Sequence, residues 1–124
     1  MKRATVALHL GSLKHAVEKL DIPQGTLDLM ILTILVREPM HGYGVSQRLA
    51  ALSRDEFQVN PGSLFPSLYR LEQDGKLKAE WRASENNRKA KYYRLTSSGK
   101  RQLEQHRERW DRTQFAITSV LEGA

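Results

Sequence analysis

The stretch NPGSLFPSLYRLEQDGKLKAEW, residues 60–81, carries the signals that decide the fold. Asn60 is a favourable helix N-cap, and Pro61 suits the first helical position, where a missing N–H costs nothing. Gly75 is placed to be the left-handed residue that ends the helix. The inward stripe of this helix consists of Leu64, Leu68 and Leu71. The pattern therefore predicts a helix that starts near Pro61 and ends before Gly75.

One residue conflicts with this helix. Pro66 lies inside it, where proline removes a backbone hydrogen bond and crowds the preceding turn, at a cost of about 3 kcal/mol. We expect either a distorted first turn or a regular helix that begins later than Pro61. A local rule broken in this way indicates function or strain.

A β-hairpin is predicted directly after the helix. Apolar and charged residues alternate through Leu77, Lys78, Ala79, Glu80, Trp81 and Arg82, which is the period of a half-buried strand. A polar loop over 84–89 contains the turn signal Asn86-Asn87. A second strand over 90–95 completes a hairpin with a cationic tip.

Two helices are predicted before residue 60. Apolar residues at helical spacing indicate a central, buried helix over 26–37, which stops before Pro39. After the breaker Glu38-Pro39-Met40, a shorter helix is expected over 43–52, followed by a polar turn over 53–58. Residues 1–21 predict only a loose helix or a frayed arm.

The last predicted helix, over 97–121 with Thr96 as its cap, is long relative to the rest of the chain. Its apolar stripe consists of Leu103, Trp110, Ile117, Val120 and Leu121. Three short helices already fill the core, so a partner chain is the expected cover, although the helix could also fold back on its own domain. We therefore predict an arm over 1–21, a domain of three helices and a hairpin over 22–96 and a dimerisation helix over 97–124.

Charge is concentrated in one part of the chain. The 124 residues include 20 Lys or Arg and 14 Asp or Glu, a formal charge of +6. Residues 62–101 hold ten of these cations and four of the anions, so they account for the whole excess. A local basic field suits a polyanion such as nucleic acid, although a solvated cationic face would look the same.

Composition excludes several other classes of protein. The chain has no cysteine, so it has no disulfide framework and no thiolate site. The apolar run 27–36 is too short to span a bilayer, and residues 1–21 lack the features of a cleavable signal, so we expect a cytoplasmic protein. The spacing of the histidines disfavours a metal site, and no nucleophile or phosphate-loop motif occurs. We expect neither a cofactor nor enzymatic activity.

The order helix, helix, helix, basic hairpin, long helix describes a winged helix-turn-helix, a mainly α fold with a small β-hairpin (α+β). The chain resembles the PadR-type transcriptional regulators in four segments taken in order, which together cover residues 24–103: QGTLDLMILTIL, HGYGVSQRL, NPGSLFPSLYRLEQDGKLKAEW and RKAKYYRLTSSGKRQL. The resemblance implies a homodimer joined by its C-terminal helix, as in the family's shorter branch. It also implies repression at a palindromic DNA site, often relieved by a small phenolic or hydrophobic ligand.

The candidate DNA contacts come from three places. At the start of the helix over 61–74, Gly62 and Ser63 can meet a phosphate, and the residues that face outward are Phe65, Pro66, Tyr69 and Arg70. For Gly62 and Ser63 the alternative role is helix capping. Tyr69 could equally pack under the wing. Phe65 stands where the family usually has tyrosine, which would remove a hydroxyl contact. The wing offers Arg88, Lys89 and Lys91 for phosphates, and the second helix begins with His41 and Tyr43, for which packing or turn chemistry is an alternative.

Two further readings stay open. By the resemblance, Trp110 could stack on a planar effector near the dimer interface, or it could simply pack there. The function could also be that of a winged-helix module that binds protein and not DNA, since fold alone does not determine function. The polar, cation-flanked third helix favours DNA.

Overall fold

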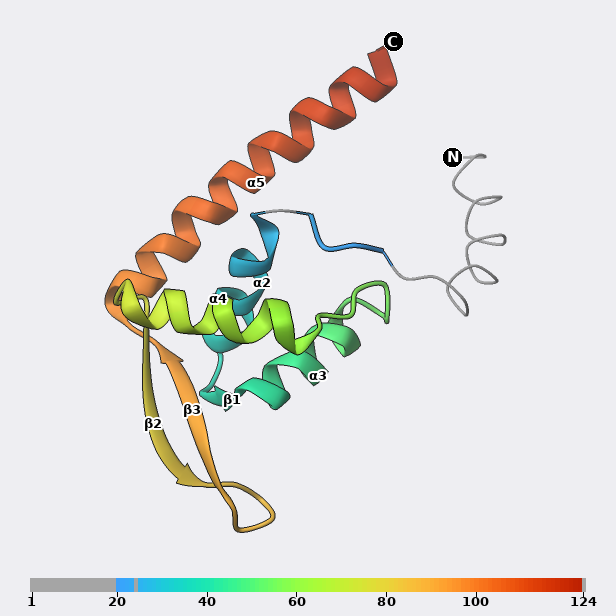
Figure 1. Ribbon diagram of the computed structural model, residues 1–124. Helices are drawn as coiled ribbons and strands as arrows, with labels where there is room; N and C mark the ends of the chain where they lie inside the picture. The colour runs from blue at the N-terminus through green and yellow to red at the C-terminus, as the bar shows by residue number, and fades with distance from the viewer. Residues whose placement is uncertain (1–19, 24, 124) are drawn as a thin grey trace.

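The computed structural model describes residues 20–23 and 25–123, so nearly all of the predicted arm over 1–21 lies outside the described residues. Within these described residues, four helices and three strands follow one another (Figure 1). They are α2 (Thr26–Leu35), β1 (Met40–His41), α3 (Gly42–Leu52), α4 (Pro61–Gln73), β2 (Leu77–Ala83), β3 (Lys89–Leu95) and α5 (Ser97–Gly123). The predicted winged helix-turn-helix with a long C-terminal helix is confirmed.

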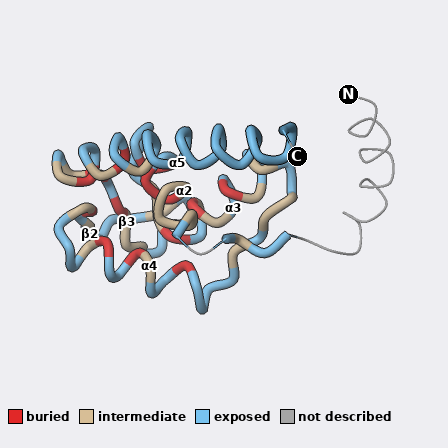
Figure 2. The backbone as a smooth tube through the Cα atoms, turned by 90° about the horizontal axis from the view of Figure 1, so that it is seen from above, coloured by how far each residue is buried: buried red, intermediate tan, exposed pale blue. Residues whose placement is uncertain are grey.

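Helix α2 lies at the centre of the core. It ends two residues before the predicted Arg37, and its buried side chains are Ile31, Leu32, Ile34 and Leu35. Three elements pack around α2. Helix α3 contributes Val45 and Leu49, and α4 contributes Leu64, Leu68 and Leu71. The sheet contributes Leu77, Tyr93 and Leu95. Buried positions in Figure 2 gather where these elements meet. The α4 stripe is therefore buried as its spacing predicted.

The sheet has one strand more than the sequence predicted. Its antiparallel order is β1-β3-β2, and β1 adds the pairs Met40–Tyr93 and His41–Tyr92 to the edge of the hairpin. The sequence indicates only a breaker from Glu38 to Met40, and this interpretation is incomplete because Met40 also begins β1. Two residues are too few to show the alternation that identifies a strand.

Helix α4 is built as its first and last residues predicted. The side chain of Asn60 accepts a hydrogen bond from the backbone N–H of Ser63 at 3.0 Å, and Gly75 has a φ of 75° in the left-handed region. The helix begins at Pro61 with Pro66 inside it, so a later start is excluded. Pro66 cannot donate to the carbonyl of Gly62, which lies on the exposed first turn where water can serve it.

The wing joins α5 through a hydrogen-bonded junction. The hydroxyl of Thr96 donates to the carbonyl of Gly75 at 2.6 Å and accepts from the backbone N–H of Gly99 at 3.0 Å. The backbone N–H of Thr96 donates to the carbonyl of Lys76. A Cβ on Gly99 would collide with that same carbonyl oxygen. Thr96 thus caps α5, as predicted, and also fastens it to the turn between α4 and β2.

Most of α5 lies outside this core. Gly99 and Leu103 are its buried residues, and Leu103 is only 8% exposed within its own chain. The assignment of Leu103 to a dimer interface is therefore corrected, because the side chain belongs to the core of one chain. Every residue from 107 to 123 is exposed, and Figure 2 shows this part of α5 as an uncovered rod.

Candidate nucleic-acid interface

The first turn of α4 presents its backbone to solvent. Gly62 and Ser63 are both exposed, directly after the Asn60 cap. The N-terminus of a helix carries partial positive charge and backbone N–H groups that suit a phosphate. The structure thus places these two residues where a phosphate contact is geometrically open to them.

Phe65 faces outward but also joins α4 to α3. A Cβ on Gly42 would lie 2.5 Å from a carbon of the Phe65 ring, so only glycine permits this close approach. The ring is still 47% exposed on its other side. Phe65 therefore fixes the distance between the two helices of the helix-turn-helix and keeps one face free.

The outward positions 69 and 70 differ from each other. Tyr69 is 62% exposed. Arg70 instead makes a two-point ion pair with the carboxylate of Asp28 in the first turn of α2, at 2.8 and 2.9 Å. The hydrogen bonds from this pair raise the pKa of the Arg70 guanidinium. The guanidinium is thus held against α2, across the flank of α4.

The wing cations also divide into two groups. Lys91 donates to the carboxylate of Glu72 on α4 at 2.9 Å, and this hydrogen bond raises the pKa of its ammonium group. Arg88 and Lys89 are exposed near the tip, and no carboxylate among the described residues pairs with either side chain. Of the three wing cations named as candidate contacts, Arg88 and Lys89 are therefore the two whose charge is open to a ligand.

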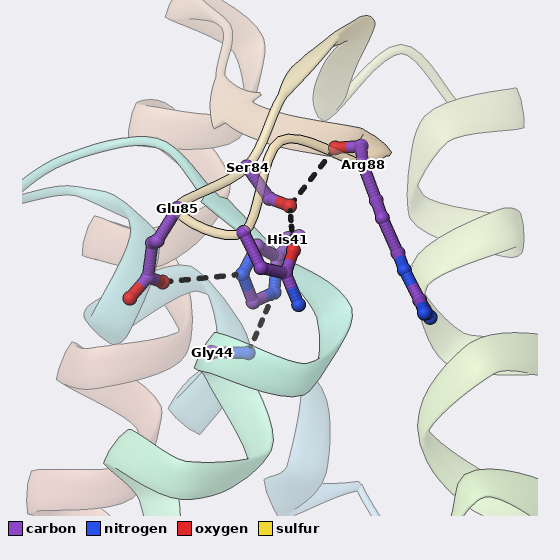
Figure 3. A network of polar contacts seen from close by, with 6 residues as sticks. His41, Gly44, Ser84, Glu85 and Arg88 are labelled. Atoms are coloured by element: carbon purple, nitrogen blue, oxygen red, sulfur yellow. Dashed lines mark hydrogen bonds and ion pairs between the residues drawn. The ribbon is translucent and has the colours of Figure 1, made fainter.

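The wing tip is held in a tight turn. The backbone N–H of Ser84 donates to the carbonyl of Arg88 at 2.7 Å, and Asn87 has a left-handed φ of 63°. Asparagine tolerates this conformation better than most residues, which explains why the Asn86-Asn87 signal marks the turn. The Arg88 side chain extends away from this turn in Figure 3.

His41 connects the wing tip to the start of α3 (Figure 3). Its Nδ1 accepts a hydrogen bond from the backbone N–H of Gly44 at 3.0 Å, so His41 is the N-cap of α3. In the neutral ring the proton is then on Nε2, which lies 3.9 Å from a carboxylate oxygen of Glu85. The turn-chemistry alternative for His41 is thus realised, whereas Tyr43 beside it is 66% exposed.

A groove of about 710 Å³ separates the wing from the two helices. Its walls include Gly42, Tyr43 and Phe65 on the helical side and Trp81, Arg88, Lys89 and Lys91 on the wing. Trp81 was not singled out by sequence reasoning, because its alternation with charged residues predicted a half-buried position. The structure leaves it 67% exposed, since the strand runs past the edge of the core before it reaches residue 81.

The candidate effector residue lies in a different place. Trp110 is 42% exposed and lines an apolar cleft of about 450 Å³ between α5 and the outer sides of α2 and α3. The other apolar walls are Leu29, Met30, Ile34, Leu49, Leu52 and Phe57. Farther along α5, Ile117, Val120 and Leu121 are 54%, 67% and 74% exposed. The predicted stripe is therefore free from Trp110 onward.

Comparison with known proteins identifies the family. Residues 31–105 match the sequence model of the transcriptional regulator PadR-like family. The chain belongs to the PadR-like family of transcriptional regulators. The match covers the second half of α2, the sheet, α3, α4 and the first part of α5, and so includes all the elements that build the groove and the wing.

Individual PadR-like relatives agree with this assignment. The chain is 34% identical over 87 residues to the transcriptional regulator Rv3488 of Mycobacterium tuberculosis, covering 70% of this chain and 78% of that protein. The PadR-like transcriptional regulator BC4206 of Bacillus cereus has a solved structure with a TM-score of 0.71, 30% identity, and coverage of 82% and 96%. A PadR family regulator from Eggerthella lenta gives a TM-score of 0.70 at 28% identity, covering 99% of this chain and 97% of its own.

Within residues 20–23 and 25–123, none of the helices combines the length and the apolar character that a membrane span requires.

Proposed function

We propose that this PadR-like regulator is a sequence-specific DNA-binding repressor that acts as a homodimer on a palindromic operator. The observation that carries the proposal is the pairing of an exposed α4 N-terminus with a wing tip whose cations have no carboxylate partner within residues 20–23 and 25–123. Gly62 and Ser63 supply the first, and Arg88 and Lys89 the second. A helix of this kind enters the major groove with its N-terminal residues, and wing cations then meet the neighbouring backbone.

The candidate DNA contacts fall into two groups: residues that are exposed to solvent and residues whose side chains already bind another part of the chain. Gly62, Ser63 and Pro66 of α4 are open to DNA, together with the exposed faces of Tyr43, Phe65 and Tyr69. Arg70 and Lys91 are engaged by Asp28 and Glu72, so we assign both to holding α4 in position. His41 acts through the α3 cap. Direct phosphate contact falls to Arg88 and Lys89.

Dimerisation is assigned to the exposed stripe of α5. Trp110, Ile117 and Leu121 follow one another at spacings of seven and four residues, which places them on one side of a helix. Exposed apolar side chains in such a row suit a second copy of the same helix. Two DNA-binding units joined in this way would read half-sites about 34 Å apart, one turn of the duplex.

Relief of repression is assigned to the apolar cleft beside Trp110. Its volume of about 450 Å³ and its predominantly apolar lining suit a small planar hydrophobic or phenolic molecule. The indole ring on one wall can stack on such a molecule. A ligand held between α5 and α2 would act on the angle between the dimerisation helix and the DNA-binding unit.

Binding to DNA provides the decisive test. The purified chain is titrated against a labelled duplex from the region upstream of its own gene and against a scrambled duplex of equal length, at several salt concentrations. We expect a preference of roughly a thousandfold or more for the upstream duplex and a steep fall of affinity with salt. Equal, weak binding to both duplexes at every salt concentration would contradict a specific regulator and favour the protein-interaction module.

Two matched double variants test the assignment of Arg88 and Lys89 to phosphate contacts. Changing Arg88 and Lys89 together to alanine should weaken both duplexes similarly and reduce the salt slope by about two for each DNA-binding unit, or about four for the dimer. The control changes Lys100 and Arg101, an equally exposed neighbouring pair at the start of α5, and should leave the slope unchanged. A changed sequence preference in the Arg88 and Lys89 variant would show that these residues read bases instead.

A further inference from the structure

We infer that Trp81 is a DNA contact: its indole ring packs against the deoxyribose groups of the strand that passes between the wing and α4. The inference rests on the proposed DNA-binding function and adds to it a residue, a binding groove and the part of the nucleotide that is recognised. It starts from the exposure of the ring, since 67% of Trp81 is open to solvent. A large aromatic side chain left exposed at a candidate interface calls for a partner.

The position of Trp81 on its strand shows which way the ring faces. In β2, Leu77 is buried and Ala79 is partly buried, and Trp81 continues the same side of the strand. The residue opposite Trp81 in β3 is Lys91, whose ammonium group reaches Glu72 on α4. Directly opposite residues share one face of a sheet. Trp81 therefore lies on the face that looks toward α4, beyond the edge of the core.

The chemistry of the groove selects its occupant. Its exposed aromatic walls are Trp81, Phe65 and Tyr43. Its rim carries Arg88 and Lys89 together with one carboxylate, Glu85, which is 91% exposed and lies 3.9 Å from Nε2 of His41. The third cation of the lining, Lys91, is held by Glu72 of α4. Apolar walls beneath free cations match a strand in which sugars alternate with phosphates. An acidic peptide is the competing occupant.

The inference predicts that substitution of Trp81 and substitution of the neighbouring cations change DNA affinity and its salt dependence in different ways. Trp81→Ala should weaken binding to specific and scrambled duplexes alike, by roughly tenfold, because a sugar contact carries no base information. The salt slope should stay unchanged, since no charge is removed. Trp81→Phe keeps a flat aromatic face and should recover most of the affinity. The control Val36→Ala removes exposed apolar surface from the turn after α2 and should leave DNA affinity unaltered.

A direct observation of the ring completes the test. The full chain contains two tryptophans, Trp81 and Trp110, so biosynthetic labelling with a ring-fluorinated tryptophan gives two fluorine NMR signals, and Trp81→Phe identifies which is which. In the free protein the Trp81 signal should respond to exchanging H₂O for D₂O. On addition of duplex DNA it should shift and lose that response, while labelled-duplex anisotropy measured in parallel reports binding.

The outcomes are distinguishable. Loss of solvent response at Trp81 in the complex, together with uniform weakening by Trp81→Ala and recovery by Trp81→Phe, supports the inference. Duplex binding with an unchanged Trp81 signal overturns it and leaves the DNA-binding function intact. Absence of binding to any duplex overturns both, and an acidic peptide that alone shifts Trp81 assigns the groove to a protein partner. If Trp81→Ala fails to fold by circular dichroism, the fluorine signals of the unaltered sequence decide the matter.

Discussion

The two halves of this protein bury their apolar residues in opposite ways. From α2 to β3, the spaced leucines, isoleucines and valine close around one another, so that Ile31, Leu32 and Leu68 are fully buried. Along α5 beyond Leu103, the apolar residues are spaced just as regularly, yet Trp110, Ile117 and Leu121 remain exposed. The same periodic pattern thus describes a stripe with a partner in its own chain and a stripe without one.

The difference shows what periodicity does and does not specify. An apolar stripe reports that one side of a helix will be covered, because exposed apolar surface costs about 25 cal/mol per Å². It does not report which surface provides the cover. In α4 the cover comes from α2, α3 and the sheet. In α5 the last buried side chain is Leu103, and the helix then runs on beyond the winged unit formed by α2 to β3 (Figure 1).

The largest effect is expected where the stripe is uncovered. Replacing both Ile117 and Leu121 by serine should abolish the proposed dimer at micromolar concentration. Two copies would lose four apolar side chains, worth about 1.5 kcal/mol or more each, or about 6 kcal/mol in total. Light scattering of the full chain should then report half the mass, with helical circular dichroism retained.

The control for this prediction lies on the other side of the same helix. Serine at Glu108 and Arg112 alters two exposed residues roughly opposite the stripe and should leave the mass unchanged. An unaltered chain that is monomeric over the whole concentration range would contradict the contrast between the halves, because α5 would then need no cover.

A smaller but still large effect is expected inside the winged unit. Leu68→Ala removes a side chain that is fully buried against its own chain, and should lower the free energy of unfolding by about 2–5 kcal/mol. Urea unfolding at a fixed protein concentration measures this loss. Lys78→Ala, an exposed change on β2, should shift the same curve by less than about 0.5 kcal/mol. A similar loss for both variants would mean that the winged unit lacks the fixed core described here.

The smallest effect is expected at the edge of that core. Asp28→Arg and Arg70→Asp should each destabilise the protein slightly, and the double variant should recover stability because it restores an ion pair. We expect a coupling energy of about 0.5–1 kcal/mol, since 52% of the Arg70 side chain is exposed.

Affinity for DNA separates the two possible roles of Arg70. If it positions α4, the double variant should regain part of the affinity lost by Arg70→Asp, as measured by anisotropy. If it contacts a phosphate, the exchanged pair should bind no better than Arg70→Asp alone, and the assignment of Arg70 to positioning is then wrong.

Sequence reasoning predicted best where local signals are strong. The Asn60 cap, the Gly75 terminus and the two hairpin strands were each determined by neighbouring residues, and the structure confirms them within a few positions. Strand β1 was missed because two residues carry no period. Its existence depends on β3, about fifty residues away in the chain.

Partners distant in sequence explain the remaining differences at the candidate site. Arg70 was correctly predicted to face outward, but Asp28, its partner, lies 42 positions earlier, and nothing local to α4 indicates the pair. Trp81 shows the reverse case, since its alternation resembled that of a half-buried residue while the core ends before it. A pattern gives the face of an element, whereas the extent of the neighbouring elements decides what that face meets.

The junction at Thr96 and Gly99 has a mechanical consequence. Thr96 forms hydrogen bonds to the Gly75–Lys76 turn, and the backbone of α5 packs directly on Lys76 at Gly99. The long helix is therefore rigidly attached to the winged unit at its first turn. At about 1.5 Å per residue, its 27 residues span roughly 40 Å, so a tilt of about 6° moves the far end by roughly 4 Å. In a dimer whose two α5 helices cross, a change in the crossing angle alters the separation of the two α4 helices. A small molecule bound beside α5 is therefore large enough to cause such a change.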